Sequence, residues 1–330
     1  MRALVTGAGG FVGQWLCSEL LRDGWDVHGA STTGAPAGGT LKDWQRDAVY
    51  WHDADVRDRE DMVEVVDAAR PDAVFHLAGI ASVAAAAADR AKAWSTNVDG
   101  AKVVLDVIAE RRRGGTVDPV VLVAGSGEQY GAHDAADMPL VETAELRPVT
   151  LYAETKVAQE QAALACWKET GTRVIAVRAF NHSGPGQAPT FLLPALVKRA
   201  QEARASGTAK VAVGNVTPIR DFLHVEDVAR AYIYLALRGH AGEVYNVCSG
   251  TGTSVADVAA MILRSVEDAD RFVPDASAPS LELTPDPAHV RPVDVPVLVG
   301  SHAKLTATTT WEPRNTLEML IDDLVYGEAD

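Results

Sequence analysis

Short apolar runs alternate with longer helical patterns through the first half of the chain. Such runs are typical of strands that are buried on both faces, as in a parallel sheet covered by helices. The pattern therefore predicts an α/β fold built on a parallel sheet. The expected strands are Ala3–Thr6, Val27–Ala30, Ala48–His52, Ala73–Ala78, Val120–Ala124 and Val174–Arg178. The expected helices are Phe11–Arg22, Arg59–Ala69, Ala84–Arg112 and Tyr152–Glu169.

The pattern changes after Arg178. Residues 181–194 are rich in Gly and Pro, and two more helices are expected at Val225–Leu237 and Val255–Val266. At 330 residues the chain exceeds roughly 250 residues, above which single cores tend to split. These observations predict a doubly wound parallel-sheet domain of the Rossmann type and a smaller α/β C-terminal substrate lobe. We expect the larger domain to hold residues 1–178 and 220–248, and the lobe to hold residues 179–219 and 249–330.

Charge and composition exclude several classes of partner. The formal net charge is −15 at pH 7, from 30 Lys and Arg against 45 Asp and Glu, which disfavours binding to nucleic acid. The most apolar stretch, Ala73–Ala88, is shorter than the roughly 20 residues of a membrane span, and no signal peptide is expected. Cys17, Cys166 and Cys248 lack CxxC spacing, which favours buried thiols in a reducing cytoplasm. The nine histidines are scattered, so no metal site is expected.

A glycine-rich segment, Thr6–Gly13, follows the first expected strand and opens the first expected helix. Gly7 permits a tight turn, Gly10 lets the backbone approach a pyrophosphate, and Gly13 lets the helix pack against the strand. The N-terminus of the helix offers its N–H groups and the positive end of its dipole to the phosphates. A glycine triplet alone is weak evidence, but its place between a strand and a helix predicts a dinucleotide site.

The end of the second expected strand leaves both NAD(H) and NADP(H) open. An acidic residue there would bind the 2′-hydroxyl of NAD, and a nearby arginine would bind the 2′-phosphate of NADP. Residues 29–34 contain neither, and the hydroxyl of Ser31 could bond to either group. The missing carboxylate favours NADP(H). Asp55, after the third expected strand, could accept from the adenine amino group or cap the helix that follows.

Tyr152 and Lys156 are four residues apart at the start of an expected helix and therefore share one face. A nearby cation lowers the pKa of a phenol, so Lys156 would let Tyr152 act as an acid or base near neutral pH. Ser126 ends the fifth expected strand, at the edge where open parallel sheets bind ligands, and its hydroxyl could hold a substrate oxygen. A Tyr-x-x-x-Lys pair alone is usually ordinary helix surface, so its position carries the prediction.

Together these segments resemble the extended short-chain dehydrogenase/reductase family, in its nucleotide-sugar-modifying branch. The resemblance covers essentially the whole chain and rests on Thr6–Gly13, Phe75–Gly79, Asn97–Gly100, Ser126-x-x-x-Tyr130-Gly131 and Tyr152-x-x-x-Lys156. It implies that Tyr152 is the general acid/base, that Lys156 tunes it and holds the nicotinamide ribose, and that Ser126 supports the carbonyl. The cofactor-binding residues that it implies are Gly7, Gly10, Phe11, Val12, Gly13, Ser31, Asp55, Val56, Leu77, Ala78, Gly79, Tyr152 and Lys156.

Three residues of the second lobe match substrate-binding motifs of this branch. Asn181, in the turn Asn181–Gln187, is similar to the residue that contacts the diphosphate of the nucleotide sugar. Arg220 matches the arginine that pairs with the same diphosphate, and bidentate guanidinium–phosphate bonding explains this residue type. Arg291 resembles a second phosphate ligand. Each arginine taken alone would be a surface or salt-bridge residue.

Three segments resemble the GDP-4-keto-6-deoxy-D-mannose reductases in particular: Phe180–Gln187, Gly242–Gly250 and Arg291–Gly300. The resemblance implies that a hydride passes from NAD(P)H to the C4 carbonyl and a proton from Tyr152, giving GDP-D-rhamnose. The nucleotide base and the product's stereochemistry at C4 stay open. The resemblance also implies a homodimer formed by two long helices that cover the sheet, one of them Ala84–Arg112.

Glu128 keeps other activities open. In the related 4,6-dehydratases a glutamate at this position removes the C5 proton, whereas here it could also be a loop carboxylate that lines the sugar pocket. An NAD-dependent nucleotide-sugar 4-epimerase would use the same Tyr152 and Lys156. A catalytically silent nucleotide-binding scaffold would share only the fold.

Overall fold

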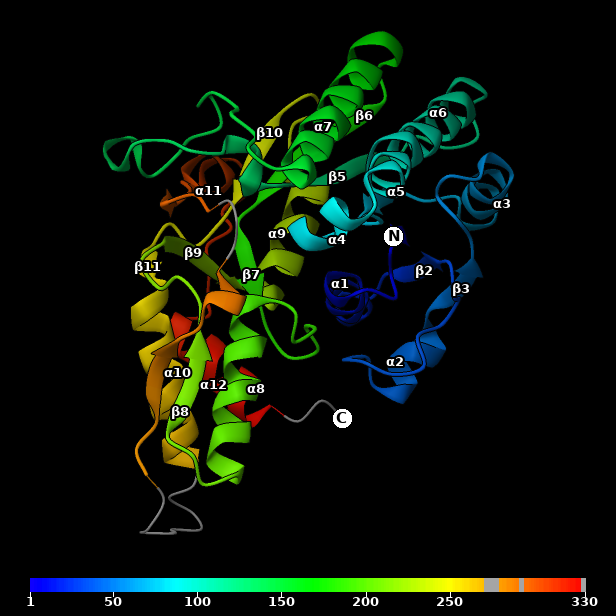
Figure 1. Ribbon diagram of the computed structural model, residues 1–330. Helices are drawn as coiled ribbons and strands as arrows, with labels where there is room; N and C mark the ends of the chain where they lie inside the picture. The colour runs from blue at the N-terminus through cyan, green and yellow to red at the C-terminus, as the bar shows by residue number, and fades with distance from the viewer. Residues whose placement is uncertain (270–278, 291–293, 328–330) are drawn as a thin grey trace.

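Seven parallel strands form the central sheet of the protein (Figure 1). The computed structural model describes residues 1–269, 279–290 and 294–327. The spatial order is β10-β6-β5-β4-β1-β2-β3, so the chain winds outward in both directions from the β1–β4 pair. The strands are β1 Arg2–Thr6, β2 Asp26–Ser31, β3 Tyr50–Asp53, β4 Ala73–His76, β5 Val120–Ser126, β6 Arg173–Ala179 and β10 Val244–Val247. This architecture confirms the prediction of a doubly wound parallel sheet.

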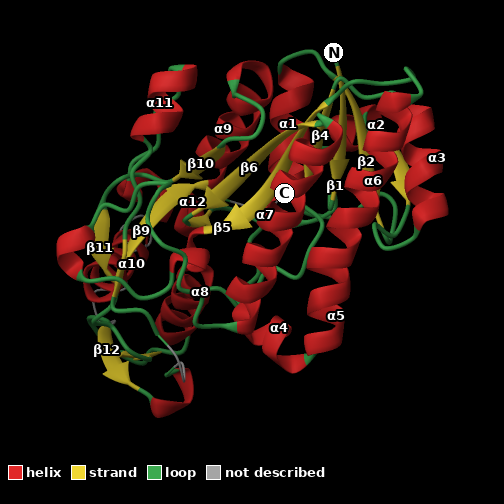
Figure 2. Ribbon diagram, turned by 90° about the horizontal axis from the view of Figure 1, so that it is seen from above, coloured by secondary structure: helices red, strands yellow, loops and turns green. Residues whose placement is uncertain are grey.

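Helices cover both faces of this sheet, which explains why its inner strands are mostly apolar on both faces. Leu16 and Leu20 of α1 pack with Val228 and Leu235 of α9 on one face. The other face is covered by α3, α6 and α7, in a core that includes Ile108. The bounds are α1 Phe11–Arg22, α3 Arg59–Ala69, α6 Gly100–Arg113, α7 Leu151–Thr170 and α9 Val225–Arg238. Figure 2 shows these helices flanking the strands.

The expected helix Ala84–Arg112 is wrong as a single element. The chain there forms α4 Val83–Ala88, α5 Arg90–Trp94, a π-helical turn η1 Ser95–Asp99, and then α6. Asp89 leaves the helical conformation, with φ −142° and ψ 88°, and its carboxylate accepts from the backbone N–H of Lys92. Aspartate competes with the helix by such local capping, and the high helix propensity of the alanines before it hides the break.

The expected strand Ala48–His52 begins two residues later, at Tyr50, because Asp43–Ala48 forms the short helix α2. The side chain of Gln45 in this helix accepts from the backbone N–H of Lys42, which fixes the first turn. A helix of six residues is too short to show a clear hydrophobic period, so no sequence pattern indicated it.

A second, smaller α/β unit follows β6. In it β9 pairs with β7, β11 and β13, while β8 pairs with β12. Three helices pack on these strands around Leu196, Ile262 and Leu320. The bounds are β7 Asn181–Ser183, α8 Leu192–Ala205, β8 Lys210–Val213, β9 Ile219–His224, β11 Gly252–Ser254, α10 Val255–Ala269, β12 Glu282–Pro285, β13 Val297–Leu298 and α12 Leu317–Tyr326. A further helix, α11 Ala303–Thr309, packs back on α9 and β10 of the larger unit, and its Leu305 belongs to that core. The expected residue boundaries of the two lobes stay a prediction.

Across the described residues no helix combines the length and the apolar character that crossing a membrane requires.

Candidate active site

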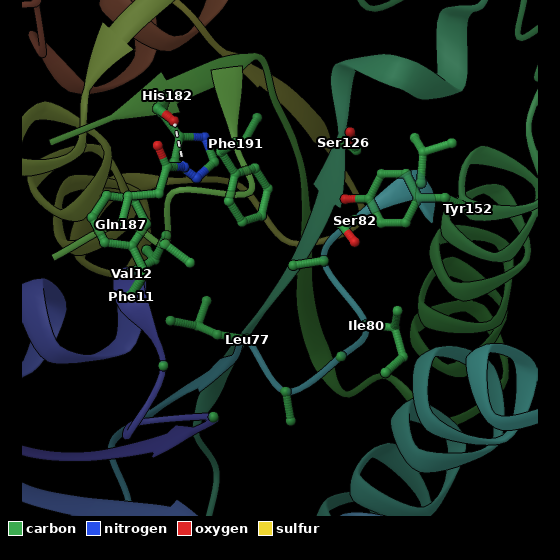
Figure 3. Close-up of a pocket in the computed structure, with 18 of the residues that line it drawn as sticks. Phe11, Val12, Leu77, Ile80, Ser82, Ser126, Tyr152, His182, Gln187 and Phe191 are labelled. Carbon is green, nitrogen blue, oxygen red and sulfur yellow. Dashed lines mark hydrogen bonds between the residues drawn. The ribbon is translucent and has the colours of Figure 1, made fainter. Parts of the chain in front are cut away.

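A large cavity of about 1440 Å³ lies at the carboxyl ends of the central strands, where the smaller unit faces the sheet. Open parallel sheets bind ligands at this edge, beside the point where the strand order reverses. Figure 3 shows Phe11 and Val12 on one side of this space and Ser126 and Tyr152 on another. The predicted site residues that line it are Gly7, Gly10, Phe11, Val12, Gly13, Ser31, Asp55, Val56, Leu77, Ala78, Gly79, Ser126, Glu128, Tyr152, Asn181 and Arg220.

The glycine-rich turn packs too closely for side chains at two of its positions. Gly7 has a φ of 72°, and a Cβ there would lie 2.8 Å from the backbone N of Ala78. A Cβ on Gly13 would lie 2.3 Å from the carbonyl oxygen of Gly7, so only glycine lets α1 approach the end of β1 so closely. Gly10 precedes α1 and supplies no side-chain cap. The residues at the start of this helix line the cavity, and their backbone N–H groups have no side-chain cap, as a phosphate site requires.

At the end of β2, Ser31 is held by its own loop. Its hydroxyl donates to the carbonyl oxygen of Gly34 at 2.8 Å and accepts from the backbone N–H of Thr33 at 3.3 Å. Asp55 lies across from it after β3, and its carboxylate is paired with Arg57 at 2.5 Å. The hydrogen bond from Arg57 keeps the pKa of Asp55 below its usual range. Asp58, not Asp55, caps α3, so the alternative of Asp55 as a helix cap is wrong.

Ser126 and Tyr152 meet at the end of β5. Ser126 ends that strand, and its hydroxyl accepts from the backbone N–H of Glu128 at 3.2 Å. Burial raises the pKa of Tyr152 to about 12, a hydrogen bond with Ser126 opposes the rise, and the charge of Glu128 adds to it. The predicted lowering of this pKa by Lys156 is therefore wrong for this structure, because the loss of solvation of the phenolate is the largest contribution. Tyr152 is held in its neutral form.

Lys156 lies beneath the cavity wall and is 6% exposed. Its ammonium donates to the backbone oxygen of Ala124 at 2.9 Å and to Gln159 Oε1 at 2.8 Å. Burial lowers the pKa of Lys156 to about 8, since a charged amine is costly to remove from water. Lys156 is thus brought to β5 by the same helix that carries Tyr152.

Two of the predicted substrate residues reach the cavity from the smaller unit. Asn181 begins β7, and Arg220 lies on β9, 5% exposed. The guanidinium of Arg220 is paired with Asp294 at 2.5 Å, and both side chains line the cavity. Arg291 lies outside the described residues.

Sequence reasoning missed a buried network directly behind Ser126. Gln129 Oε1 accepts from the backbone N–H of Ser126 at 2.8 Å, and Gln129 Nε2 donates to Glu160 at 2.9 Å. Glu160 in turn accepts two bonds from Arg178, at 2.9 and 2.7 Å. The spacing Ser126-x-x-Gln129 is a capping-box pattern and could have pointed to Gln129. Its partners Glu160 and Arg178 had no such local signal.

Over the described part of the chain, no three His, Cys, Asp or Glu side chains gather closely enough to hold a metal ion.

Comparison with known proteins agrees with this geometry. Residues 3–248 match the model of the NAD dependent epimerase/dehydratase family. The chain is 34% identical to the GDP-6-deoxy-D-mannose reductase of Pseudomonas aeruginosa over 249 residues, which are 75% of this chain and 77% of the relative. It is 26% identical to the UDP-glucose 4-epimerase of Streptomyces lividans, over 97% of this chain and 94% of that one.

The solved structure of RMD from Pseudomonas aeruginosa complexed with NADPH superposes with a TM-score of 0.79 and 28% identity, covering 98% of each chain. The match to the family model spans well over half of the residues and includes the glycine-rich turn and the Tyr152–Lys156 pair. The protein therefore belongs to the NAD dependent epimerase/dehydratase family, the nucleotide-sugar branch of the extended short-chain dehydrogenases/reductases.

Proposed function

We propose that the protein reduces the C4 keto group of a GDP-linked 4-keto-6-deoxy sugar, most simply GDP-4-keto-6-deoxy-D-mannose to GDP-D-rhamnose. The observation that carries this proposal is the meeting of three groups of residues in one cavity: the glycine-rich turn, the Ser126–Tyr152 pair and Arg220 with Asn181. The 34% identity with a GDP-6-deoxy-D-mannose reductase supports the choice of sugar and base.

The residues around the glycine-rich turn fit a nicotinamide dinucleotide. The close packing of Gly7 and Gly13 leaves a shallow backbone surface at the uncapped start of α1 for the pyrophosphate. We propose NADP(H) as the preferred cofactor, because residues 29–34 place no carboxylate near the 2′ position and Ser31 offers a hydroxyl. NADPH supplies the hydride for C4 when it is bound. The chain supplies orientation and the proton.

Tyr152 is the proposed proton donor. With a pKa raised to about 12 it keeps its proton at neutral pH, as reduction of a carbonyl requires. As C4 accepts the hydride, the O–H bond of Tyr152 breaks and its proton goes to the carbonyl oxygen, while Ser126 donates a hydrogen bond to the same oxygen. Lys156, as a cation, stabilises the phenolate that remains until solvent returns a proton.

A 4,6-dehydratase is the second candidate, and Glu128 is the observation that favours it. Glu128 lines the cavity beside Ser126, close enough to Tyr152 for its charge to raise the pKa of the phenol. A carboxylate at this place could accept the C5 proton. In the proposed reductase, Glu128 instead lines the sugar end of the cavity.

The test is oxidation of NADPH and NADH by the purified protein with GDP-4-keto-6-deoxymannose, beside the thymidine-linked analogue. We expect stoichiometric oxidation with the guanosine sugar, a higher kcat/KM with NADPH, and GDP-D-rhamnose identified by NMR. No oxidation with either sugar, together with NAD⁺ released from the denatured protein, would contradict the reductase and favour a dehydratase or an epimerase.

We also propose that the protein is a homodimer paired through α6 and α7. Half-buried apolar side chains, Val103 on α6 and Trp167 on α7, lie on this side of the sheet and support the choice of face. Equilibrium sedimentation at micromolar concentration should give twice the chain mass of 35.0 kDa, and a monomer alone would contradict it. A cytoplasmic location stays a prediction.

A further inference from the structure

The ammonium of Lys156 is held from two directions by uncharged oxygens. One is the backbone oxygen of Ala124 at the end of β5, and the other is Gln159 Oε1, one turn further along α7. An ammonium has three N–H donors. Two are thus occupied within the described structure, and the third direction is set by the first two.

Gly79 is a cavity-lining residue that lies next to this ammonium. A Cβ added to it would lie 2.9 Å from Asn97 Oδ1 and 3.6 Å from Lys156 Nζ. The missing side chain therefore lets this part of the lining approach the layer that holds Nζ. The direction in which the ammonium points its third N–H depends on the two bonds that hold it.

Gln159 carries a cost that packing alone does not explain. It is 1% exposed, and its Nε2 has no hydrogen-bond partner within the described residues. A buried amide group left unsatisfied is unfavourable, whereas methionine or leucine would fill the same volume without any polar atom to satisfy. The hydrogen bond that Gln159 Oε1 accepts from Lys156 offsets the cost of the unsatisfied Nε2. Lys156 is also a residue that the proposed reaction needs.

We propose that Gln159 is a positioning residue that holds Lys156 as an ammonium next to Gly79. This inference rests on the proposed function, in which Lys156 acts as a cation toward Tyr152 and the ribose. Gln159 supplies the negative end of an amide dipole to a cation that has no carboxylate partner among the described residues. Without it, Lys156 would keep a single acceptor, and its neutral form would be favoured at lower pH.

The other groups around Lys156 leave this role to Gln159. His76 faces the same layer from β4, but burial and the charge of Lys156 lower its pKa to about 3, so it is neutral above pH 5. Tyr152, one turn earlier on α7, has a pKa of about 12. Glu160 is engaged by Arg178 and Gln129. Ala124 and Ser126 of β5, Asn97 of η1 and the alanines of α4 bring no charge.

The direct test is the titration of Lys156 in Gln159→Met and Gln159→Glu, which does not depend on any activity. Proteins labelled with 13Cε-lysine are titrated by NMR between pH 6 and pH 11, and Lys156→Met assigns the resonance. The wild-type resonance should titrate near pH 8. We expect Gln159→Met to lower this midpoint by about one pH unit, the size of a hydrogen bond to a charged group, and Gln159→Glu to raise it.

Steady-state kinetics then connect the titration to the reaction. The alkaline limb of kcat/KM should move to lower pH in Gln159→Met and to higher pH in Gln159→Glu, and the loss of kcat in Gln159→Met should be smaller near pH 6.5 than at pH 8. Gln201→Met, an exposed glutamine of α8, is the matched control and should change neither curve.

Equal midpoints in the wild type and both variants would overturn the role of Gln159. An equal loss of activity at every pH, with an unmoved midpoint, would make Gln159 a purely structural residue and would also overturn it. Midpoints that move as expected in a protein that does not oxidise NADPH would keep the positioning role and contradict the proposed reductase instead.

Discussion

Two buried clusters both include residues of α7, and buried charge is balanced differently in each. In the first, formed by Gln129, Glu160 and Arg178, the guanidinium meets a carboxylate in two hydrogen bonds. Burial works against the charge of Arg178, but the bonds and the charge of Glu160 outweigh it and raise its pKa. In the second, formed by Ser126, Tyr152, Lys156 and Gln159, the cation has only uncharged acceptors and its pKa falls to about 8.

The difference distinguishes a charged group that stabilises the fold, Arg178, from one whose protonation can change near neutral pH, Lys156. A buried charge that is paired with a counterion keeps its protonation state near neutral pH, because the counterion stabilises the charged form. A buried charge without a counterion is poised close to a change of state, as groups at functional sites often are. The first cluster fixes Ser126 from behind through Gln129, so the poised cluster depends on the paired one for its geometry.

The largest effect is expected from Tyr152→Phe. It removes the proposed proton donor from the poised cluster without changing its volume, so turnover should fall by about 10²–10⁴-fold. NADPH oxidation with the keto sugar measures the loss, and fluorescence titration with NADPH should show unchanged binding. Retention of more than a tenth of the turnover would remove Tyr152 from its assigned role.

Glu160→Gln should break the paired cluster. It leaves Arg178 buried, 5% exposed, without a counterion, and breaking a buried pair in this way costs about 3–5 kcal/mol of unfolding free energy. Urea unfolding monitored by circular dichroism measures it. Glu154→Gln, on the same helix but 3.9 Å from exposed Arg90, is the control and should change stability by less than about 1 kcal/mol. Equal effects of both variants would contradict the distinction between the clusters.

Lys156→Met should raise the free energy of unfolding, whereas Glu160→Gln should lower it. The pKa of Lys156 is about 8 in the folded chain against 10.5 for the free side chain, so unfolding binds more protons between these values. Wild-type stability should rise with pH from about 8 to 10.5, and at pH 7 the methionine variant should be more stable by about 1–2 kcal/mol. Urea unfolding at pH 7, 9 and 10.5 tests this. A variant that is less stable than the wild type, and whose unfolding free energy depends on pH as the wild type's does, would show that burial of the ammonium does not destabilise the fold.

The smallest effect concerns His76, which is buried behind Lys156 and bonded to Thr6 at 2.9 Å. Its pKa is lowered to about 3 from 6.5, so the unfolded chain binds its proton first and stability is lost as pH falls below 6.5. His76→Gln should reduce the acid loss between pH 6.5 and 5.5 by about 1 kcal/mol. Thermal unfolding across this range measures it, and parallel curves for the variant and the wild type would argue against a neutral buried His76.

The parts of the fold that could be predicted are those with local signals. The expected helices at Phe11–Arg22 and Arg59–Ala69 match the structure residue for residue, because their apolar period and end signals lie within the element. The glycine-rich turn and the Tyr152–Lys156 spacing could be read for the same reason. The expected helix Ala84–Arg112 is interrupted at Asp89, whose side chain caps the next helix. The alanine-rich composition of this segment did not indicate that break.

The parts that could not be predicted depend on partners far away in the chain. β8 and β12 are four residues each and pair across about seventy positions, so neither is recognisable alone. Gln159 lies on α7 and belongs to no recognisable sequence motif. Its proposed role follows from its hydrogen bond with Lys156, which only the structure shows. Arg220 was found by resemblance, but its pairing with Asp294, 74 residues later, needed the structure.

The short connections between the two sheets have a consequence for how a ligand enters. The chain passes from β6 to β7 through Phe180 alone, from β9 straight into α9, and from β10 to β11 over residues 248–251. Several short connections of this kind between the two units restrict a large hinge rotation of one unit relative to the other. We expect the substrate to enter past surface loops with little opening of the body, so that the spacing between Tyr152 and the diphosphate site is nearly the same before and after binding.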